Sequence, residues 1–248
     1  MKDLTSMNDK KTFQYHISKY FTRYLHAERN VSPNTIASYA DTFKLFLNYF
    51  ETVLNIRTNK IQLDDITKEN VTDFLDWLEN ERNVTISSRN VRLSAIHSFI
   101  KYVQSEDPEH IYEYRKILSI KNKKYKTADI PYLSINQIKA ILKAPDSTTQ
   151  HGFRDKVLLT VLYDTAARVD ELIHLTFNDV KLDKPATITL NGKGNKIRVV
   201  PIMGNTVELL QKYISFIKRC SKYQPSQKYL FINRSHNALT RAGISCII

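Results

Sequence analysis

RDKVLLTVLYDTAARVDELIHLTFNDV, residues 154–180, is the stretch that says most about which fold this chain adopts. Its apolar spacing predicts a helix that ends near Ala166 and is followed at once by the helical pattern RVDELIHL. Arg168 therefore lies where one apolar helix stops and another begins. It can form a local ion pair with Asp164 or Glu171, each about one helical turn away, which is a common and weak interaction. Alternatively, it can present its charge to a ligand.

A β-hairpin is predicted after this stretch. The segments ATITL, residues 186–190, and IRVVPI, residues 197–202, are short and rich in β-branched residues. They are separated by NGKGN, which is a strong hairpin signal and places Lys193 at the tip. Lys193 is either a solubilising turn residue or a cation held out toward a partner. The apolar spacing of the following segment predicts a further helix that includes Leu209 and Ile217.

The first 150 residues are predicted to be mostly helical, because all five glycines of the chain lie beyond residue 150. Helical spacing begins at Phe13, and Ser32 with Pro33 supplies a cap and a first helical residue. A third helix is predicted after Thr67 and a fourth over residues 87–103. In the second half, the capping residue Ser134 starts another helix.

Basic residues gather on the fourth helix and directly after it. Arg89, Arg92 and Lys101 are predicted to remain available to solvent while the apolar positions pack inward. The following segment holds Lys121, Lys123, Lys124 and Lys126 before Pro131 and is interpreted as a basic linker. Such residues are either a solvated surface or contacts that follow a phosphate backbone. We expect the second role for the linker.

The composition favours an anionic partner. The chain of 248 residues has 37 Lys and Arg against 25 Asp and Glu, a formal net charge of +12, and 42% hydrophobic residues. It is therefore expected to be globular, with nucleic acid as the leading partner. No apolar run approaches a membrane span and the N-terminus lacks a signal-peptide pattern, so a cytoplasmic protein without a membrane partner is expected. Cys220 and Cys246 are too few for a disulfide framework or a zinc site.

These segments together resemble the tyrosine recombinase family, the phage-integrase-type site-specific recombinases, over roughly residues 13–245. ERNVSPNTIASYADTFKLFLNYF is similar to the opening helices of the family, and SSRNVRLSAIHSFIKYV to the last large helix of its core-binding domain. Residues 154–180 resemble the first catalytic motif, and ITLNGKGNKIRVVPI resembles the hairpin that bears the catalytic lysine.

The resemblance implies a mainly α-helical fold with a small β-hairpin or sheet in the second domain. It implies a helical SAM-like core-binding domain over residues 11–107, a basic linker over 108–131 and a partial α+β catalytic domain over 132–248. DNA contacts are expected from the basic residues of the fourth helix, the linker and the hairpin. These residues are Arg89, Arg92, Lys121, Lys123, Lys124 and Lys196.

The resemblance also implies roles at a scissile phosphate. Arg168 would be the first active-site arginine, Lys193 the catalytic lysine, and Glu171 the supporting acidic residue, while Ala166 replaces the usual glycine. A planar guanidinium can grip the oxygens on which negative charge builds, and a lysine on a hairpin tip can protonate the departing oxygen. This chemistry requires no metal and no cofactor.

The family pattern continues with a His-x-x-Arg box and a late tyrosine nucleophile, neither of which is recognised within residues 1–248. The sequence is therefore expected to be a C-terminally truncated recombinase that is inactive alone. The literal His-x-x-Arg matches at His26 and His151 precede Arg168 and are interpreted as coincidence. The later tyrosines are interpreted as packing residues. They are Tyr213, Tyr223 and Tyr229.

Two functions remain open from the sequence. The chain can belong to a recombinase or integrase of a mobile element that cuts and rejoins double-stranded DNA, with a homo-oligomer on the DNA as a compatible assembly. Alternatively, it can be a catalytically inactive DNA-binding module that occupies recombination sites or regulates an intact enzyme. The target sequence and the host element cannot be read from the residues.

Overall fold

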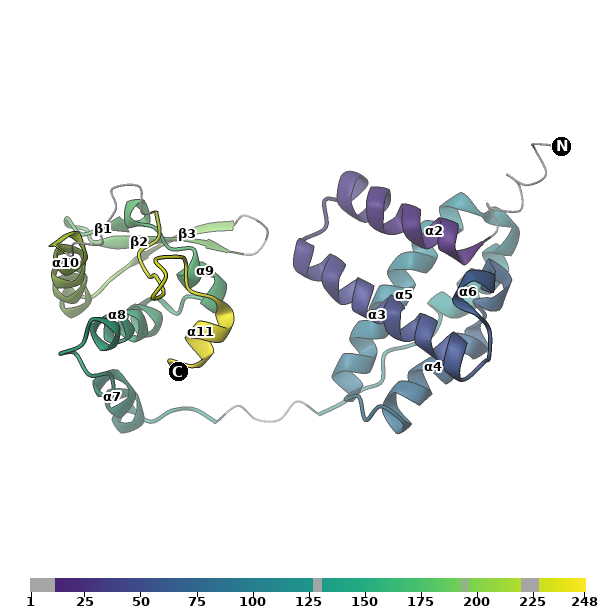
Figure 1. Ribbon diagram of the computed structural model, residues 1–248, viewed down its shortest axis with the longest axis horizontal. Helices are drawn as coiled ribbons and strands as arrows, with labels where there is room; N and C mark the ends of the chain where they lie inside the picture. Colours follow the sequence, from purple (N-terminus) through teal and green to yellow (C-terminus); the bar gives the residue numbers. More distant parts are fainter. Residues whose placement is uncertain (1–11, 127–130, 193, 195, 220–227) are drawn as a thin grey trace. The chain divides into compact units, whose positions relative to one another are not determined.

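The computed structural model describes residues 12–126, 131–192, 194, 196–219 and 228–248. The chain divides into two compact units, Met1–Asp129, here called the helical unit, and Ile130–Ile248, here called the C-terminal unit (Figure 1). The described residues confirm the expected fold class, because helices dominate and the strands form one small sheet. None of the helices in these ranges has the length and apolar character needed to cross a bilayer.

The helices of the helical unit begin where the sequence places capping side chains. Ser32 accepts a hydrogen bond from the Thr35 N–H, and Thr67 accepts one from the Asn70 N–H, as predicted. The longer elements are α2 (Phe13–Lys19), the π-helix η1 (Tyr20–Glu28), α3 (Pro33–Thr52), α4 (Lys68–Asn80), α5 (Ile86–Glu106) and α6 (Ile111–Leu118). Short 3-10 turns are η2 (Thr58–Lys60), η3 (Leu63–Asp65) and η4 (Pro108–His110).

An aromatic cluster forms the core of the helical unit. The Phe99 ring of α5 lies 5.4 Å from Phe13, 5.3 Å from Tyr20 and 5.2 Å from Phe43, all in edge-on arrangements. Such ring pairs contribute roughly 0.5–1.5 kcal/mol each beyond their buried area. Tyr20 is fully buried, and its hydroxyl donates to Ser98 Oγ over 2.8 Å. Burial raises the pKa of the Tyr20 hydroxyl, so it stays a neutral donor that fixes η1 to α5.

A helix beyond residue 107 packs onto the core of the helical unit. Helix α6 lies in the segment that was expected to be linker, and it buries Tyr114 and Ile117 against the aromatic core. The Tyr114 hydroxyl donates to Asp107 Oδ2 over 2.9 Å. Only two of the 8 residues of this short helix are buried, so it gives little periodic signal, which is why the sequence pattern weakens there. Residues 120–126 lie outside helices and strands.

The C-terminal unit packs helices against a three-stranded antiparallel sheet of order β1-β2-β3 (Figure 1). Its helices are α7 (Ile135–Lys143), α8 (Gln150–Thr165), α9 (Val169–Ile173), α10 (Gly204–Arg219) and α11 (Arg241–Ser245), with the 3-10 turn η5 (Phe177–Asp179). Its strands are β1 (Val180–Lys181), β2 (Thr187–Gly192) and β3 (Lys196–Pro201). The predicted hairpin is confirmed, since Gly192 pairs with Lys196 at one end and Thr187 with Pro201 at the other. Strand β1 was not expected.

The core of this unit lies between the sheet and helices α8 and α10. Ile188 and Leu190 alternate toward it from β2, and Val161 and Leu210 meet them from the two helices. All four side chains are fully buried. Ser134 caps α7 with a reciprocal capping box, as its position in the sequence predicts. Helix α8 and strand β2 of the hairpin thus share one core.

Candidate active site

The turn after α8 sets the position of Arg168. Helix α8 ends at Thr165, and Ala166 then adopts a left-handed backbone with φ 48° and ψ 38°. The chain changes direction there, and Arg168 becomes the N-cap residue directly before α9. A left-handed conformation suits glycine and strains alanine, because the Cβ crowds the following carbonyl oxygen. Ala166 therefore fits this junction at a cost in stability.

Glu171 is the centre of a buried charge cluster. Its side chain is only 2% exposed. One of its oxygens accepts from the Arg168 backbone N–H over 2.7 Å, and the other accepts from Arg168 Nη1 over 3.0 Å. Arg198 on β3 grips the same carboxylate with two nitrogens, each at 2.8 Å. The carboxylate thus holds two guanidinium groups, which is the bidentate geometry that favours tight arginine pairing.

Glu171 remains ionised in this setting. Burial alone would raise the pKa of its carboxyl group, but the hydrogen bonds from Arg198 and from the backbone and side chain of Arg168 outweigh that effect and lower the pKa below its ordinary value. The Arg168 side chain is 68% exposed, so one nitrogen is fixed while most of the guanidinium faces outward. Arg168 was expected either to form a local ion pair or to present its charge to a ligand. The ion pair with Glu171 is present, and it leaves the Arg168 guanidinium accessible to a ligand. Asp164 instead accepts from the Met203 N–H.

The hairpin approaches this cluster at Gly192. A Cβ at Gly192 would lie 2.8 Å from Glu171 Oε1 and 3.3 Å from the Lys196 carbonyl oxygen, so the approach requires glycine. Lys193, the expected catalytic lysine, lies outside the described residues. Its neighbour Gly192 is described and touches the cluster, and Lys196 is exposed. The structure thus joins the turn end of the hairpin to the segment Ala166–Glu171, here called the arginine turn.

Sequence reasoning missed Arg198. It stands in a β-branched segment and pairs in register with Leu190, so its side chain lies among strand positions that the pattern assigned to packing. Its nitrogens also reach the Ala166 carbonyl oxygen at 3.3 Å, which links β3 to the left-handed turn. A cation within an otherwise apolar hairpin strand was the available signal. Its partner, 27 residues earlier, could not be identified without the fold.

The expected exposure of Arg89 is wrong. Arg89 is 3% exposed and its Nε donates to Glu79 Oε1 over 3.1 Å. Arg92 is partly buried and donates from Nη1 to the Ser38 carbonyl oxygen and Thr42 Oγ1, at 3.1 and 3.2 Å. Both arginines therefore fasten α5 to neighbouring helices. The reason is that α5 is flanked by α3 and α4, which enclose the positions of these two arginines and leave other polar positions of the helix exposed.

The lysines after α6 differ in their surroundings. Lys121 and Lys124 are exposed. The Lys123 ammonium lies 2.7 Å from Glu79 Oε1 and 3.4 Å from Asp76 Oδ1, and the hydrogen bond to Glu79 raises its pKa. Lys123 is therefore engaged by carboxylates, whereas Lys121 and Lys124 present their charges outward. Lys123 is itself partly exposed, but its charge is already paired, whereas Lys121 and Lys124 are accessible for contact with phosphate.

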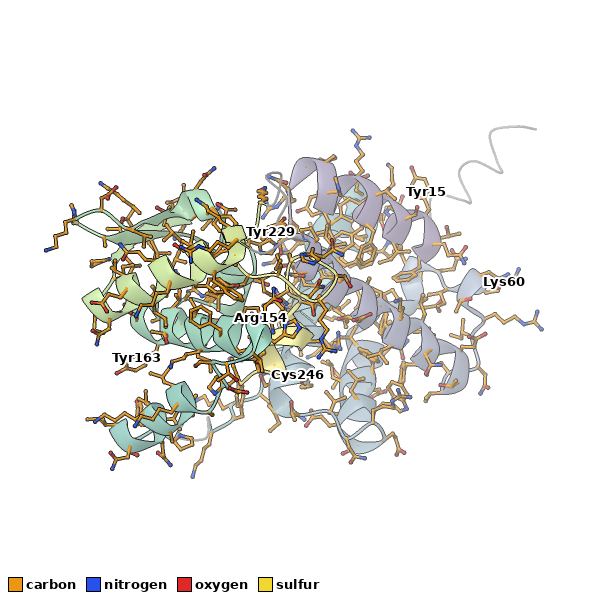
Figure 2. The ribbon with its side chains drawn as sticks, turned by 60° about the vertical axis from the view of Figure 1, so that its left-hand side comes forward. Tyr15, Lys60, Arg154, Tyr163, Tyr229 and Cys246 are labelled. Atoms are coloured by element: carbon orange, nitrogen blue, oxygen red, sulfur yellow. The ribbon has the colours of Figure 1, made fainter. Side chains whose placement is uncertain are left out.

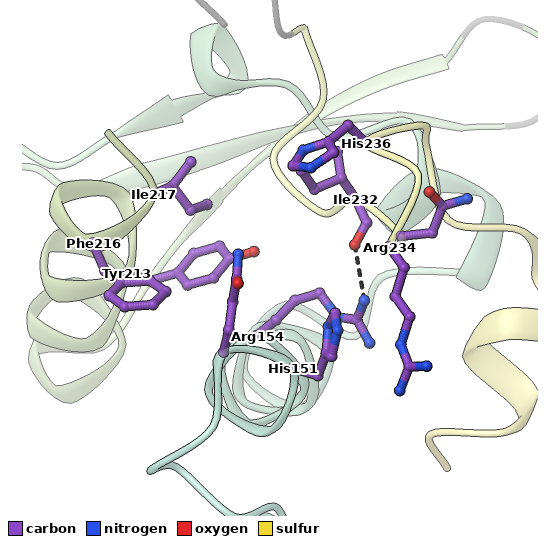
Figure 3. Close-up of a pocket in the computed structure, with 10 residues that line it drawn as sticks. His151, Arg154, Tyr213, Phe216, Ile217, Ile232, Arg234 and His236 are labelled. Carbon is purple, nitrogen blue, oxygen red and sulfur yellow. Dashed lines mark hydrogen bonds between the residues drawn. The ribbon is translucent and has the colours of Figure 1, made fainter. Parts of the chain in front are cut away.

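The literal His-x-x-Arg match at His151 lies away from Arg168. His151 and Arg154 occupy the first turns of α8 and line a pocket with Tyr213 (Figure 3). Arg154 Nη1 donates to the Ile232 carbonyl oxygen over 2.8 Å, the dashed line in Figure 3. Roughly 17 Å of helix axis separate Arg154 from the end of α8, at 1.5 Å per residue. The match therefore does not contribute to the cluster around Glu171. The other match, at His26, lies in η1.

Among the described residues, the later tyrosines occupy structural positions. Tyr213 is 2% exposed, stacks on Phe231 and donates its hydroxyl to the Leu230 carbonyl oxygen, which confirms its packing role. Tyr229 is half-buried and forms an isolated bridge with Thr176. Tyr163, labelled in Figure 2, is 54% exposed on α8. Tyr223 and Cys220 lie outside the described residues, and Cys246 is exposed as a free thiol.

Comparisons with known proteins show the family of the chain. The model described as "Phage integrase family" matches residues 131–248, and "Phage integrase, N-terminal SAM-like domain" matches residues 19–107. The chain is 31% identical over 233 residues to "Putative integrase/recombinase y4rD" of Sinorhizobium fredii, covering 94% of the chain and 82% of the relative. It is 30% identical over 238 residues to "Tyrosine recombinase XerD" of Staphylococcus epidermidis, covering 94% and 75%. A third relative, "Putative integrase/recombinase y4rC" of Sinorhizobium fredii, is 33% identical, and the chain spans 60% of its length.

Solved structures share the fold. A lambda integrase tetramer bound to a Holliday junction matches with a TM-score of 0.68 at 14% identity, over 99% of this chain and 68% of that chain. The XerH recombinase in a post-cleavage complex matches with a TM-score of 0.64 at 21% identity, over 86% and 61%. The chain belongs to the tyrosine recombinase, or phage integrase, family. Its helical unit contains the SAM-like domain, and its C-terminal unit carries the match to the integrase family.

Proposed function

We propose that the C-terminal unit holds a backbone phosphate of double-stranded DNA at Arg168 and Lys193, as part of site-specific DNA recombination. The observation that carries this proposal is the cluster in which buried Glu171 fixes an outward-facing Arg168 while Gly192 brings the hairpin against it. Two guanidinium groups surround one carboxylate, so the cluster has an excess positive charge. An anion is the ligand that such an exposed, oriented cation attracts.

In this proposal each residue has a physical role. Arg168 stabilises the negative charge that builds on the phosphate oxygens during in-line attack. Lys193, on the hairpin, gives a proton to the departing deoxyribose oxygen, and Lys196 contacts the backbone nearby. Glu171 and Arg198 are positioning residues, because they orient Arg168 and the hairpin through hydrogen bonds of 2.7–3.3 Å. All five residues act through the charge and position of their own side chains.

The helical unit supplies further contacts with the DNA backbone in this proposal. The exposed lysines Lys121 and Lys124 are its candidates, whereas Arg89 is withdrawn because it is buried and paired. Support comes from structural neighbours whose descriptions include bound DNA, such as XerH with its difH substrate and lambda integrase with a Holliday junction. The formal net charge of +12 is consistent with a polyanionic partner.

A second candidate function is occupation of recombination sites without strand cleavage. The observation that favours it is that Tyr213, one of the late tyrosines, is buried and engaged in packing. Covalent strand exchange needs a nucleophile that forms a bond to the phosphorus, so binding and cleavage are separable activities of these residues. The domain boundaries at residues 107 and 131 remain part of the proposal.

The experiment that tests the proposal uses a pool of nicked duplexes with random central sequence as suicide substrates. A covalent adduct that survives denaturation, and is lost in Arg168→Ala, supports strand cleavage by this chain. Retention of DNA without an adduct supports the second candidate. Absence of any retained DNA at low salt contradicts both candidates, because both require binding to the backbone.

A further inference from the structure

Asn90 forms a two-point clamp on the backbone of Lys123. Its Nδ2 donates to the Lys123 carbonyl oxygen over 2.9 Å, and its Oδ1 accepts from the Lys123 N–H over 3.0 Å. A side-chain amide here satisfies both backbone groups of one residue, as a neighbouring strand would. The two residues are 33 positions apart, so the clamp fastens the segment after α6 to the first turns of α5.

The side chain of Lys123 strengthens the same attachment. Its ammonium reaches Glu79 and Asp76 on α4, and Glu79 Oε1 also accepts from the buried Arg89. Lys123 is therefore fixed to α5 by its backbone and to α4 by its charge. This explains why the lysine in the middle of a basic run is turned toward carboxylates.

A shallow groove lies between α5 and the clamped segment. Ser87, Val91 and Ser94 line it from α5, and Lys124 and Tyr125 line it from the other side. Val91 is 46% exposed and Tyr125 is 51% exposed, so both apolar side chains are accessible to a ligand in the groove. Lys124 is exposed, and the ion pairs of the described residues do not include it. The groove thus combines polar, apolar and cationic side chains.

We propose that Asn90 is a positioning residue that locks residues 121–125 onto the helical unit, so that Lys121 and Lys124 contact DNA phosphates beside the exposed face of α5. This inference rests on the proposed function and refines it, since it separates Lys123 as an anchor from Lys121 and Lys124 as contacts. A cation on a locked segment loses less conformational freedom on binding than one on a free chain. Removing the clamp therefore weakens binding without removing a phosphate contact.

The test uses the full chain and the variants Asn90→Ala and Lys124→Ala, with Ser94→Ala as the matched control in the same groove. The first measurement is hydrogen exchange at the Lys123 amide by NMR, which reports the clamp whether or not DNA binds. We expect exchange in Asn90→Ala to be faster by about tenfold, the factor that one lost hydrogen bond of about 1.4 kcal/mol corresponds to. Protection of Ile96 in the middle of α5 should be unchanged, which shows that the variant is folded.

The second measurement is the affinity for a duplex across salt concentrations. Asn90→Ala should weaken binding about three- to tenfold with the salt slope unchanged, whereas Lys124→Ala should reduce the slope by about one. Unchanged exchange at Lys123 in Asn90→Ala would overturn the clamp. Faster exchange with unchanged affinity would overturn the positioning role. Failure of the unmodified chain to bind any duplex would instead overturn the proposed function, while the exchange result would still stand.

Discussion

At the scale of single residues, Ala166 is the position where this chain departs most clearly from what its backbone prefers. It is held at φ 48°, a conformation in which alanine is strained and glycine is not. We predict that Ala166→Gly raises the free energy of unfolding by about 1 kcal/mol. Urea unfolding followed by circular dichroism would measure this. Ala144→Gly, at a right-handed position after α7, is the control and should not stabilise. A less stable Ala166→Gly variant would contradict the account.

Glu171 should make stability depend on pH. Because its pKa is lowered in the folded state, its contribution is complete above the unfolded value of about 4.3 and is lost as the pH falls through the folded-state pKa. We predict that Glu171→Gln lowers the free energy of unfolding by about 1–3 kcal/mol at neutral pH, and that the difference shrinks on acidification. Urea unfolding at a series of pH values tests this. Glu208→Gln, exposed on α10, should change little at any pH.

Some residues of the candidate site could be predicted from the sequence and others could not. Arg168 and Glu171 were identified by resemblance, and the structure places them in contact. Arg198 was missed because its role depends on a partner across the fold, and Arg89 was misjudged because burial of a charged residue depends on helices that flank it. Ion pairs between residues far apart in the chain leave little pattern in the local sequence.

At the scale of elements, the hairpin and the arginine turn act as one unit through Gly192. A Cβ at this position would collide with Glu171 Oε1, so we predict that Gly192→Ala destabilises the C-terminal unit by about 1–3 kcal/mol and moves the hairpin away from Arg168. Gly204→Ala is the matched control, since a Cβ there meets nothing within 4 Å. Hydrogen exchange of the amides of β2 and β3 would measure both effects. Equal protection of these amides from exchange in the two variants would contradict the close approach of Gly192 to Glu171.

Elements with local signals were predicted well. The capping residues Ser32, Thr67 and Ser134 and the glycine-rich hairpin are all confirmed, because caps and turns depend on a few adjacent side chains. Helix α6 and strand β1 were missed. Each is short, and each is stabilised by packing or pairing with distant segments, as Tyr114 in the aromatic core illustrates.

At the scale of the whole molecule, each of the two units has its own core and its own role in the proposed binding of DNA. The helical unit presents exposed lysines after α6, and the C-terminal unit presents Arg168 on a rigid cluster. Backbone contacts of this kind release counterions, so binding to any duplex should weaken steeply as salt rises. Salt dependence therefore connects the charge of the chain to its proposed partner and can be assigned to individual residues.

The most direct measurement is the salt dependence of duplex binding by the full chain and by Arg168→Ala, with Arg234→Ala as a charge-matched control. Arg234 is also exposed, and it lies by the pocket that includes His151, at the other end of α8. We predict a steep decrease of log K with log salt for the unmodified chain, a slope smaller by about one for Arg168→Ala, and no change of slope for Arg234→Ala. Identical curves for Arg168→Ala and the unmodified chain would contradict the claim that Arg168 holds a DNA phosphate.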